Sequence, residues 1–334
     1  MAETRLTNVV VPSVFTGYTM EPSIYKSRFF KSGALVRNES MDGLLAGGGL
    51  IMQMPYWKDI SGTAGDIPSE TVAATVNPIT SDKMTFRRQF REKAWGANSL
   101  SRIEAGSDPM AALIAMVTAY WAQAFDLISI YTMRGIVADN IANDSGDLVN
   151  DVSAGVAAAG YFSDAAVIDA QAKLGENGTT GRGDENGGEF AAILVHPQVY
   201  AFMRKNDLID YVPISGQERP LEFYMGMNVI VDRNAYVNSG TYDSYILKPG
   251  ALQIGETGSG YEPTEIDRDP SMGFGIDKLY TRRCFGIQPV GTAWADTSVA
   301  GVSPTDAETY GATNWNRVFN AENMRFAVVR HKIG

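Results

Sequence analysis

Residues 107–140 predict a single long helix that is apolar on several faces. Ser107 or Asp108 supplies an N-cap oxygen, and Pro109 occupies a first-turn position where its missing N–H costs nothing. The stretch from Met110 to Phe125 carries no charge. At about 1.5 Å per residue the helix is about 50 Å long. Such a helix has to be covered from several sides, so either the rest of the chain or further copies of it enclose the helix.

The same helix is predicted not to span a membrane. Its uncharged run is shorter than the ~20 apolar residues that a span needs, and it contains Thr118 and Gln123. Asp126 and Arg134 follow on the same helix, and charged side chains are costly inside a bilayer. The sequence therefore predicts no membrane partner.

Composition narrows the class of protein. With 334 residues the chain is long enough for two or three domains. Its net charge of −10 disfavours a protein that seeks nucleic acid by bulk electrostatic attraction, but not one that encloses DNA driven in by other means. Cys284 is the only cysteine, so no disulfide forms within the chain and a cytoplasmic origin is expected. The first residues lack the apolar core of a signal peptide, and none is predicted.

The chain before the helix has little core of its own. Residues 1–45 predict an extended arm, and residues 50–57 predict a strand that leads out of it. Residues 58–101 predict a long two-stranded excursion, with strands at 71–76 and 83–95. A two-stranded hairpin is not stable alone in water, so this one is expected to dock on another surface.

The chain after the helix alternates helices and strands. A capped helix is predicted at 163–174, and a glycine-rich loop at 175–188. Strands are predicted at 190–195, 227–232, 244–254, 276–286 and 326–329, the last an edge candidate, with a helix at 198–205. Apart from Trp294, residues 292–313 are mostly small and polar and predict an exposed loop or insertion.

The sequence contains no motif typical of an active site. Only two histidines are present, and His196, at a strand end before Pro197, is interpreted as structural. His331 is close to the end of the chain. There is no Gly-x-Ser-x-Gly elbow, no H-E-x-x-H, no Walker A loop and no calcium loop. The sequence predicts no catalytic residue, no metal ligand and no cofactor.

Opposite charges gather on two extended segments. The return strand of the hairpin is basic, and a proline-flanked segment before residue 270 is acidic. The basic residues suit phosphate groups of nucleic acid, but the matching acidic strip makes contacts between subunits the preferred interpretation. The predicted intersubunit contact residues are Lys83, Arg87, Arg88, Arg91, Glu262, Glu265, Asp267 and Asp269.

The order of arm, long hairpin, long helix and α/β region resembles the major capsid proteins of tailed phages, which have the Hong Kong 97 (HK97-like) fold. The motifs that carry the resemblance are short, and their order makes them specific. They lie at 50–57 (LIMQMPYW), 107–140, 170–175 (AQAKLG), 192–200 (AILVHPQVY), 208–211 (LIDY), 226–232 (GMNVIVD) and 245–251 (YILKPGA).

By this resemblance the chain has an α+β, HK97-like capsid fold with a peripheral and an axial domain. The implied parts are an N-terminal arm and lead-in strand at 1–56, an extended loop at 57–97, a peripheral domain at 98–188 with the spine helix 107–140, an axial domain at 189–270, and a return to the peripheral domain at 271–334 with a surface loop at 292–313.

The resemblance implies a structural protein and not an enzyme. Copies would self-assemble into the pentamers and hexamers of an icosahedral phage head that encloses double-stranded DNA. The implied partners are further copies, a portal, a decoration protein and a separate scaffolding protein, because the 56 residues before Trp57 are too few for the family's internal scaffolding segment. Assembly is expected in the host bacterial cytoplasm, and the final location is the virion. Lys58 and Lys83 lie in the extended loop, but no covalent crosslink is predicted from them.

Two other functions remain as alternatives. An encapsulin-like nanocompartment shell has the same fold and holds protein cargo, and an adjacent peroxidase or ferritin-like gene would favour it. A soluble hydrolase that depends on carboxylates is the weaker alternative. A stable monomer of about 36 kDa under all conditions would contradict both kinds of shell.

Overall fold

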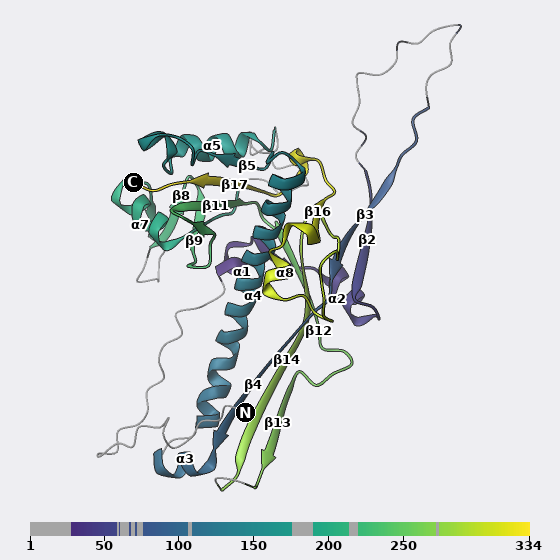
Figure 1. Cartoon of the computed structure of the whole chain (residues 1–334), viewed down its shortest axis with the longest axis vertical. Helices are drawn as coiled ribbons and strands as arrows, with labels where there is room; N and C mark the ends of the chain where they lie inside the picture. Colours follow the sequence, from purple (N-terminus) through teal and green to yellow (C-terminus); the bar gives the residue numbers. More distant parts are fainter. Residues whose placement is uncertain are drawn as a thin grey trace.

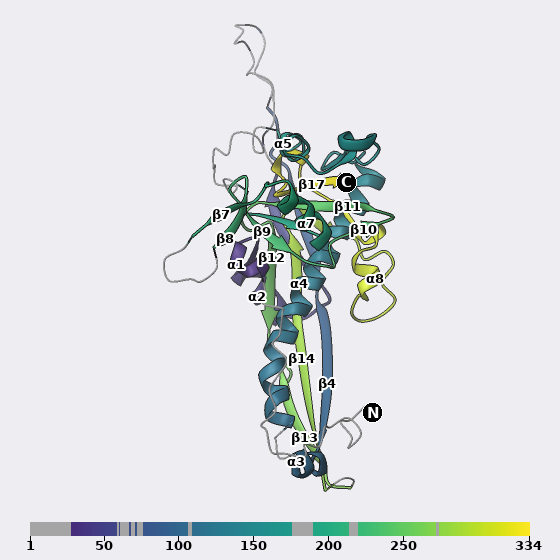
Figure 2. The same ribbon diagram turned by 90° about the vertical axis from the view of Figure 1, so that its left-hand side faces the viewer.

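The computed structural model describes residues 28–58, 60, 67, 71, 76–105, 109–175, 190–213, 220–271 and 274–334. The molecule is elongated, with an α/β body at one end and a narrow antiparallel sheet that extends from it toward the other (Figure 1). The long helix and the narrow sheet run side by side along the molecule (Figure 2). The predicted arm up to residue 27 lies outside the described residues.

Helix α4 (Pro109–Asn143) is 35 residues long and confirms the predicted long helix. Its second half lies in the main core, where the buried side chains include Ile128, Ile130, Met133, Ile136 and Val137. Its first half lies along the narrow sheet, and there Trp121 donates from Nε1 to the hydroxyl of Thr281 at 3.2 Å. The predicted cap residues Ser107 and Asp108 lie outside the described residues.

The first half of α4 leaves apolar surface uncovered by the single chain. Ile114 is 52% exposed, Met116 41% and Tyr120 36%. By length and composition the stretch Met110–Asn143 is apolar enough to cross a membrane. Within its most apolar part, 28% of the residues are buried by the rest of the protein. The core helix of a water-soluble protein has the same properties, and the second half of α4 is such a helix. The apolar side chains of the first half therefore remain exposed among the described residues.

An eight-stranded sheet forms the centre of the α/β body. Its strands are β5 (Val149–Asp151), β17 (Phe326–His331), β11 (Thr241–Leu247), β6 (Ala192–Val195), β9 (Met227–Val231), β8 (Leu221–Tyr224) and β7 (Asp210–Val212), in that order, with β10 (Val237–Asn238) paired to β11. The predicted edge position of 326–329 is wrong, because β17 pairs with both β11 and β5. Phe326–Val329 is buried on both faces, which is typical of a central strand.

Short helices surround this sheet: α1 (Arg28–Ser32), α5 (Asp164–Ala172) and α7 (Pro197–Lys205), with a 3-10 turn η2 (Ala157–Gly160). The predicted helix at 163–174 is confirmed as α5, and the Ser163 hydroxyl accepts from the N–H of Ala166 at 3.3 Å. The predicted helix at 198–205 is confirmed as α7, which follows β6; strands β7 and β8 come between α7 and β9, the parallel partner of β6. The glycine-rich loop that follows Gly175 lies outside the described residues.

A five-stranded sheet forms the narrow part of the molecule. Its strands are β1 (Leu35–Arg37), β12 (Leu252–Thr257), β14 (Ile276–Pro289), β13 (Thr264–Asp269) and β4 (Gln89–Asn98). The single strand predicted at 244–254 is wrong, because β11 and β12 belong to different sheets. Between them the N–H of Ala251 donates to Lys248 O at 3.1 Å, and Gly250 has φ +64°. This turn redirects the chain, since a left-handed φ suits glycine.

The predicted hairpin is present, with different strands. Strand β2 (Ile51–Trp57) pairs with β3 (Ser81–Arg87) over their full lengths. The return strand predicted at 83–95 is two strands, because the chain leaves the hairpin at Arg88 and continues as β4 in the five-stranded sheet. Most of the strand predicted at 71–76 lies outside the described residues. Helix α2 (Glu39–Ala46) precedes β2 in the sequence, and helix α3 (Ser99–Ala105) follows β4.

Residues 291–319, which we call the clasp, contain secondary structure where a loop was predicted at 292–313, although many residues of that range are exposed as predicted. The clasp contains β15 (Thr292–Trp294) paired with β16 (Trp315–Arg317), α8 (Asp306–Thr309) and η3 (Ala312–Asn314), and η4 (Ala321–Asn323) follows it. Trp294, Trp315, Thr309 and Asn314 are all buried. Small polar residues suggested solvent exposure, but here they bond to the backbone: Asn314 donates from Nδ2 to Glu308 O at 2.8 Å.

Candidate functional site

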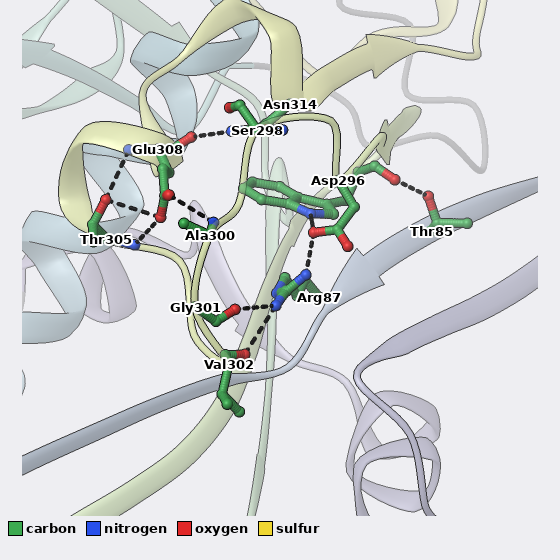
Figure 3. A network of polar contacts seen from close by, with 11 residues as sticks. Thr85, Arg87, Asp296, Ser298, Ala300, Gly301, Val302, Thr305, Glu308 and Asn314 are labelled. Atoms are coloured by element: carbon green, nitrogen blue, oxygen red, sulfur yellow. Dashed lines mark hydrogen bonds and ion pairs between the residues drawn. The ribbon is translucent and has the colours of Figure 1, made fainter.

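The base of the hairpin holds the predicted basic residues and is the candidate functional site. Arg87 ends β3, and its side chain is 5% exposed. Its Nη1 forms an ion pair with Asp296, and its Nη2 donates to the carbonyls of Gly301 at 2.9 Å and Val302 at 3.0 Å (Figure 3). All three acceptors belong to the clasp, so Arg87 joins two segments that are distant in the sequence.

The other predicted basic residues have different surroundings. Arg88 donates from Nη2 to the carbonyl oxygens of Leu45 and Gly47, the second at 2.6 Å. Arg91 pairs with Asp306 of α8 at 2.9 Å. Lys83 lies exposed on β3.

The acidic strip lies on and next to β13, an edge strand of the narrow sheet. Glu265 pairs with Arg282 at 2.9 Å, and Asp269 with Lys278 at 3.5 Å. Glu262 and Asp267 are exposed.

The structure does not bring the predicted basic and acidic groups together within one chain. Glu265 and Asp269 pair with β14, and Arg87 and Arg91 pair with the clasp. The predicted contact between these groups on neighbouring subunits stays a prediction.

The cavity beside the hairpin base is lined by four arginines, most of which are paired within the chain. It has a volume of about 690 Å³, and its lining includes Arg88, Arg91, Arg282 and Arg283. Arg91 and Arg282 have the carboxylate partners given above, and Arg283 lies 3.6 Å from Glu256. Arg88 bonds to backbone carbonyls. Three of the four guanidinium groups therefore have a carboxylate partner within the chain, and Arg88 is held by neutral carbonyl oxygens.

Ionisable side chains form no evident reaction centre in the part of the chain that the structure describes. Among those residues there is no group of three or more His, Cys, Asp or Glu side chains that could hold a metal ion. His196 caps α7, and its Nδ1 accepts from the N–H of Gln198 at 3.3 Å, which agrees with its structural interpretation. His331 is fully buried, with Nε2 2.9 Å from the Ser244 hydroxyl and Nδ1 3.0 Å from Lys332 O.

His331 predicts a loss of stability in mild acid. Burial lowers its pKa from 6.5 to about 4. Between these two values the unfolded chain binds more protons than the folded chain, so the free energy of unfolding falls as the pH falls from 6.5 to 4. The loss is about 1.4 kcal/mol per pH unit. Urea unfolding of the unassembled subunit across this window should show a flatter pH dependence for His331→Gln than for the wild type. Equal slopes would contradict the prediction.

The clasp is the part of the site that sequence reasoning missed. Asp296 carries the partner charge of a buried arginine, but nothing near it in the sequence indicates this. Two signals were available: Trp294 and Trp315 at the ends of a polar stretch, and the Thr305-x-x-Glu308 spacing of a capping box. The capping box is present and begins α8. Both signals indicate a folded segment and not an exposed loop.

Comparison with known proteins identifies the family. No protein-family model matches the chain. The chain is 30% identical, over 100% of its own length and 99% of the relative, to the major capsid protein of Bacillus phage SPP1. The chain belongs to the major capsid proteins of phages. It builds the shell of the phage head and is located in the virion capsid.

Solved capsid structures share the fold of this capsid protein. The capsid of Ralstonia phage GP4 superposes with a TM-score of 0.61 at 11% identity, over 97% of this chain and 96% of that one. The capsid of cyanophage Pam1 gives a TM-score of 0.59 at 11% identity, over 100% and 99% of the two chains. These neighbours confirm the predicted HK97-like α+β fold. The phage relatives do not favour the encapsulin-like alternative, and a structural role agrees with the prediction of a protein that is not an enzyme.

Proposed function

We propose that this capsid protein assembles as pentamers and hexamers into an icosahedral head that encloses double-stranded DNA. The observation that carries the proposal is the uncovered apolar surface on the first half of α4, together with a two-stranded hairpin of a kind that is not stable in isolation. Both features are unfavourable in a monomer. In a closed shell each becomes an interface that is repeated many times, so moderate contacts add up to a stable particle.

The proposed partners are further copies, by the same reasoning, and others that the resemblance to phage capsid proteins implies. Further copies cover α4, partly through the arm and the hairpin of adjacent subunits. A separate scaffolding protein guides assembly in the host cytoplasm, a portal occupies one vertex, and a decoration protein binds the outside. DNA is enclosed without sequence-specific contacts, in agreement with the net charge of −10.

The domain boundaries remain a proposal, and the two sheets of the structure bear on where they lie. The proposed axial domain at 189–270 contains β6 to β11 of the eight-stranded sheet, but also β12 and β13 of the five-stranded sheet, so a boundary at the turn before β12 fits the two sheets better. The proposed extended loop at 57–97 contains the second hairpin strand, β3, whereas the first, β2, lies almost wholly before it. Strand β4 is better assigned to the peripheral domain, because it pairs with β14 over its full length.

Particle size tests the proposed function. The purified protein, co-expressed with the neighbouring phage genes, is expected to elute as capsomers or as particles in the megadalton range. Electron microscopy should then show closed icosahedral shells. A stable monomer of about 36 kDa under all conditions would contradict the proposal.

The intersubunit charge contact predicts a salt-dependent assembly defect. Removal of Arg87, Arg88 and Arg91 would test it poorly, because Arg87 and Arg91 have ion-pair partners within the subunit. Glu262→Gln with Asp267→Asn is a cleaner change, because it leaves the intrachain pairs of the acidic strip intact. Assembly of this variant should be weaker than that of the wild type at about 0.1 M salt and closer to it at about 1 M, where the screening length falls from about 10 Å to about 3 Å.

The matched control for that experiment removes two exposed carboxylates elsewhere. Asp169 lies on α5 and Asp207 follows α7, and both are exposed. Asp169→Asn with Asp207→Asn changes the net charge by the same amount. If the control variant loses as much assembly as the strip variant, or if the strip variant has the same defect at both salt concentrations, the contact is refuted.

A further inference from the structure

We propose that Arg87 is a positioning residue: through the clasp it fixes the direction in which the hairpin leaves the subunit, before any neighbour binds. The inference rests on the proposed function, in which the hairpin contacts adjacent copies. It assigns a role to the clasp, the segment that joins the hairpin to α4. The argument follows the contacts from the hairpin, through Arg87, to the helix.

The clasp contacts both strands of the hairpin. From β2, Tyr56 donates its hydroxyl to Val318 O at 3.1 Å, and its ring lies 4.8 Å from that of Phe319 in an edge-on arrangement. From β3, the hydroxyl of Thr85 donates to Trp294 O at 2.8 Å. Contacts to both strands resist rotation of the hairpin as a whole, which contacts to one strand would not.

Arg87 is the strongest of these attachments. Its guanidinium is buried against one carboxylate and two carbonyls of the clasp, and charge-assisted bonds of this kind are stronger than neutral ones. Asp296 also accepts from Nε1 of Trp294 at 3.0 Å, so the same carboxylate holds the clasp in shape (Figure 3). Asp296 has φ +56°, a left-handed backbone that fixes a tight turn at this point.

The clasp in turn is fixed on α4. The ring of Trp294 lies 4.8 Å from that of Trp315, whose Nε1 donates to Thr309 O at 2.8 Å. A Cβ at Gly135 of α4 would come within 2.4 Å of Trp315 Nε1 and 2.5 Å of Thr309 O, so helix and clasp are in direct contact there. Arg317 adds an ion pair of 2.8 Å to Asp147, just after the end of the helix.

The clasp also spans the place where the chain can bend. The strand leaves the hairpin at Arg88 and enters the other sheet as β4. On the far side of this break, the N–H of Phe90 donates to the Ser303 hydroxyl at 3.1 Å, and Arg91 pairs with Asp306 at 2.9 Å. Since the clasp binds the chain on both sides of Arg88, it opposes a hinge motion at that residue.

Two variants test the positioning role. Asp296→Asn removes the charge, and asparagine tolerates the left-handed backbone. Arg87→Met with Asp296→Asn removes both charges, so no unpaired charge is left buried. Hydrogen exchange of the unassembled subunit should become about tenfold faster or more in 51–57 and 81–87 in both variants. A hairpin released from the clasp is not stable alone, so it opens and exposes these amides. Exchange in 241–247 and 326–331 should stay as in the wild type. Electron microscopy should show fewer particles or particles of irregular size.

The outcomes separate this inference from the proposed function. Lys93→Gln, an exposed charge change on β4, is the control and should match the wild type. Unchanged exchange in the hairpin strands of both variants would overturn the positioning role. Recovery of wild-type exchange in the double variant would overturn it too, because the effect of the single variant would then come only from an unpaired buried charge. Normal particles from a subunit with a loosened hairpin would also overturn it while leaving shell formation intact. Failure of the wild type to form any particle would overturn the proposed function instead.

Discussion

Replacement of Arg330 by methionine is expected to lower the free energy of unfolding by about 3–5 kcal/mol, because it leaves a buried carboxylate without its partner. Arg330 on β17 lies directly across from Asp243 on β11. Its Nε and Nη2 donate to the two carboxylate oxygens at 2.7 and 2.8 Å, and the Asp243 side chain is 2% exposed. The hydrogen bond to Asp243 raises the pKa of Arg330 above its usual value. Urea unfolding of the unassembled subunit measures the effect.

A second substitution distinguishes the loss of a partner from the loss of packing. Arg330→Met with Asp243→Leu removes both charges, and its stability should return to within about 1–2 kcal/mol of the wild type, because a buried ion pair is often replaceable by apolar side chains. The penalty of the single variant should also shrink in acid, where the isolated carboxyl of Asp243 binds a proton. If the double variant is as unstable as the single one, packing around Arg330 and not the ion pair explains the loss.

Gly135→Ala is expected to destabilise the subunit by about 1–3 kcal/mol, although alanine is the better helix former. The added Cβ would lie 2.4 Å from Trp315 Nε1 and 2.5 Å from Thr309 O. The second of these atoms belongs to the backbone, so the clasp has to move away from α4. Chemical unfolding gives the stability, and the fluorescence of Trp294 and Trp315 should report the displacement.

The same substitution at Gly43 is the matched control. Gly43 lies inside helix α2, and a Cβ there would meet no atom within 4 Å. Gly43→Ala should therefore stabilise the subunit by about 0.5–1 kcal/mol through helix propensity alone. Opposite signs for one chemical change would locate the contact between α4 and the clasp. If the Gly135→Ala variant is as stable as the wild type, the clasp can move away from α4 without loss of stability, and the prediction is wrong.

Local patterns in the sequence were sufficient for the elements with a strong period or a clear boundary. The uncharged run of α4, the Ser163 cap of α5 and the helix predicted at 198–205 all have the predicted structure, the last beginning one residue earlier, at Pro197. Their signals lie within a few residues of the element itself. The order of these elements was also sufficient for the resemblance to phage capsid proteins, which the full-length relative confirms.

Three of the four corrections have a common cause in contacts between segments that are distant in the sequence. Residues 244–254 form two strands because each half finds a different sheet, and residues 83–95 divide at Arg88 for the same reason. The residues before and after each of these breaks have similar strand propensity. Propensity therefore does not indicate where the chain leaves one sheet and pairs with a strand of another. The clasp appeared to be a loop because its buried polar groups are satisfied by atoms that are close only in the folded chain.

The sequence by itself determined the long apolar helix, the requirement that it be covered from several sides, and the order of elements typical of a capsid shell. Only the tertiary structure decided which charges are used within the subunit. Arg87 and Asp296 are separated by 209 positions in the chain, yet they form a buried ion pair. An ion pair depends on distance and burial, and neither is encoded near the residues that form it. Periodicity and caps are local and can be predicted, whereas the attachment of the hairpin to the clasp exists only after the two segments have folded together.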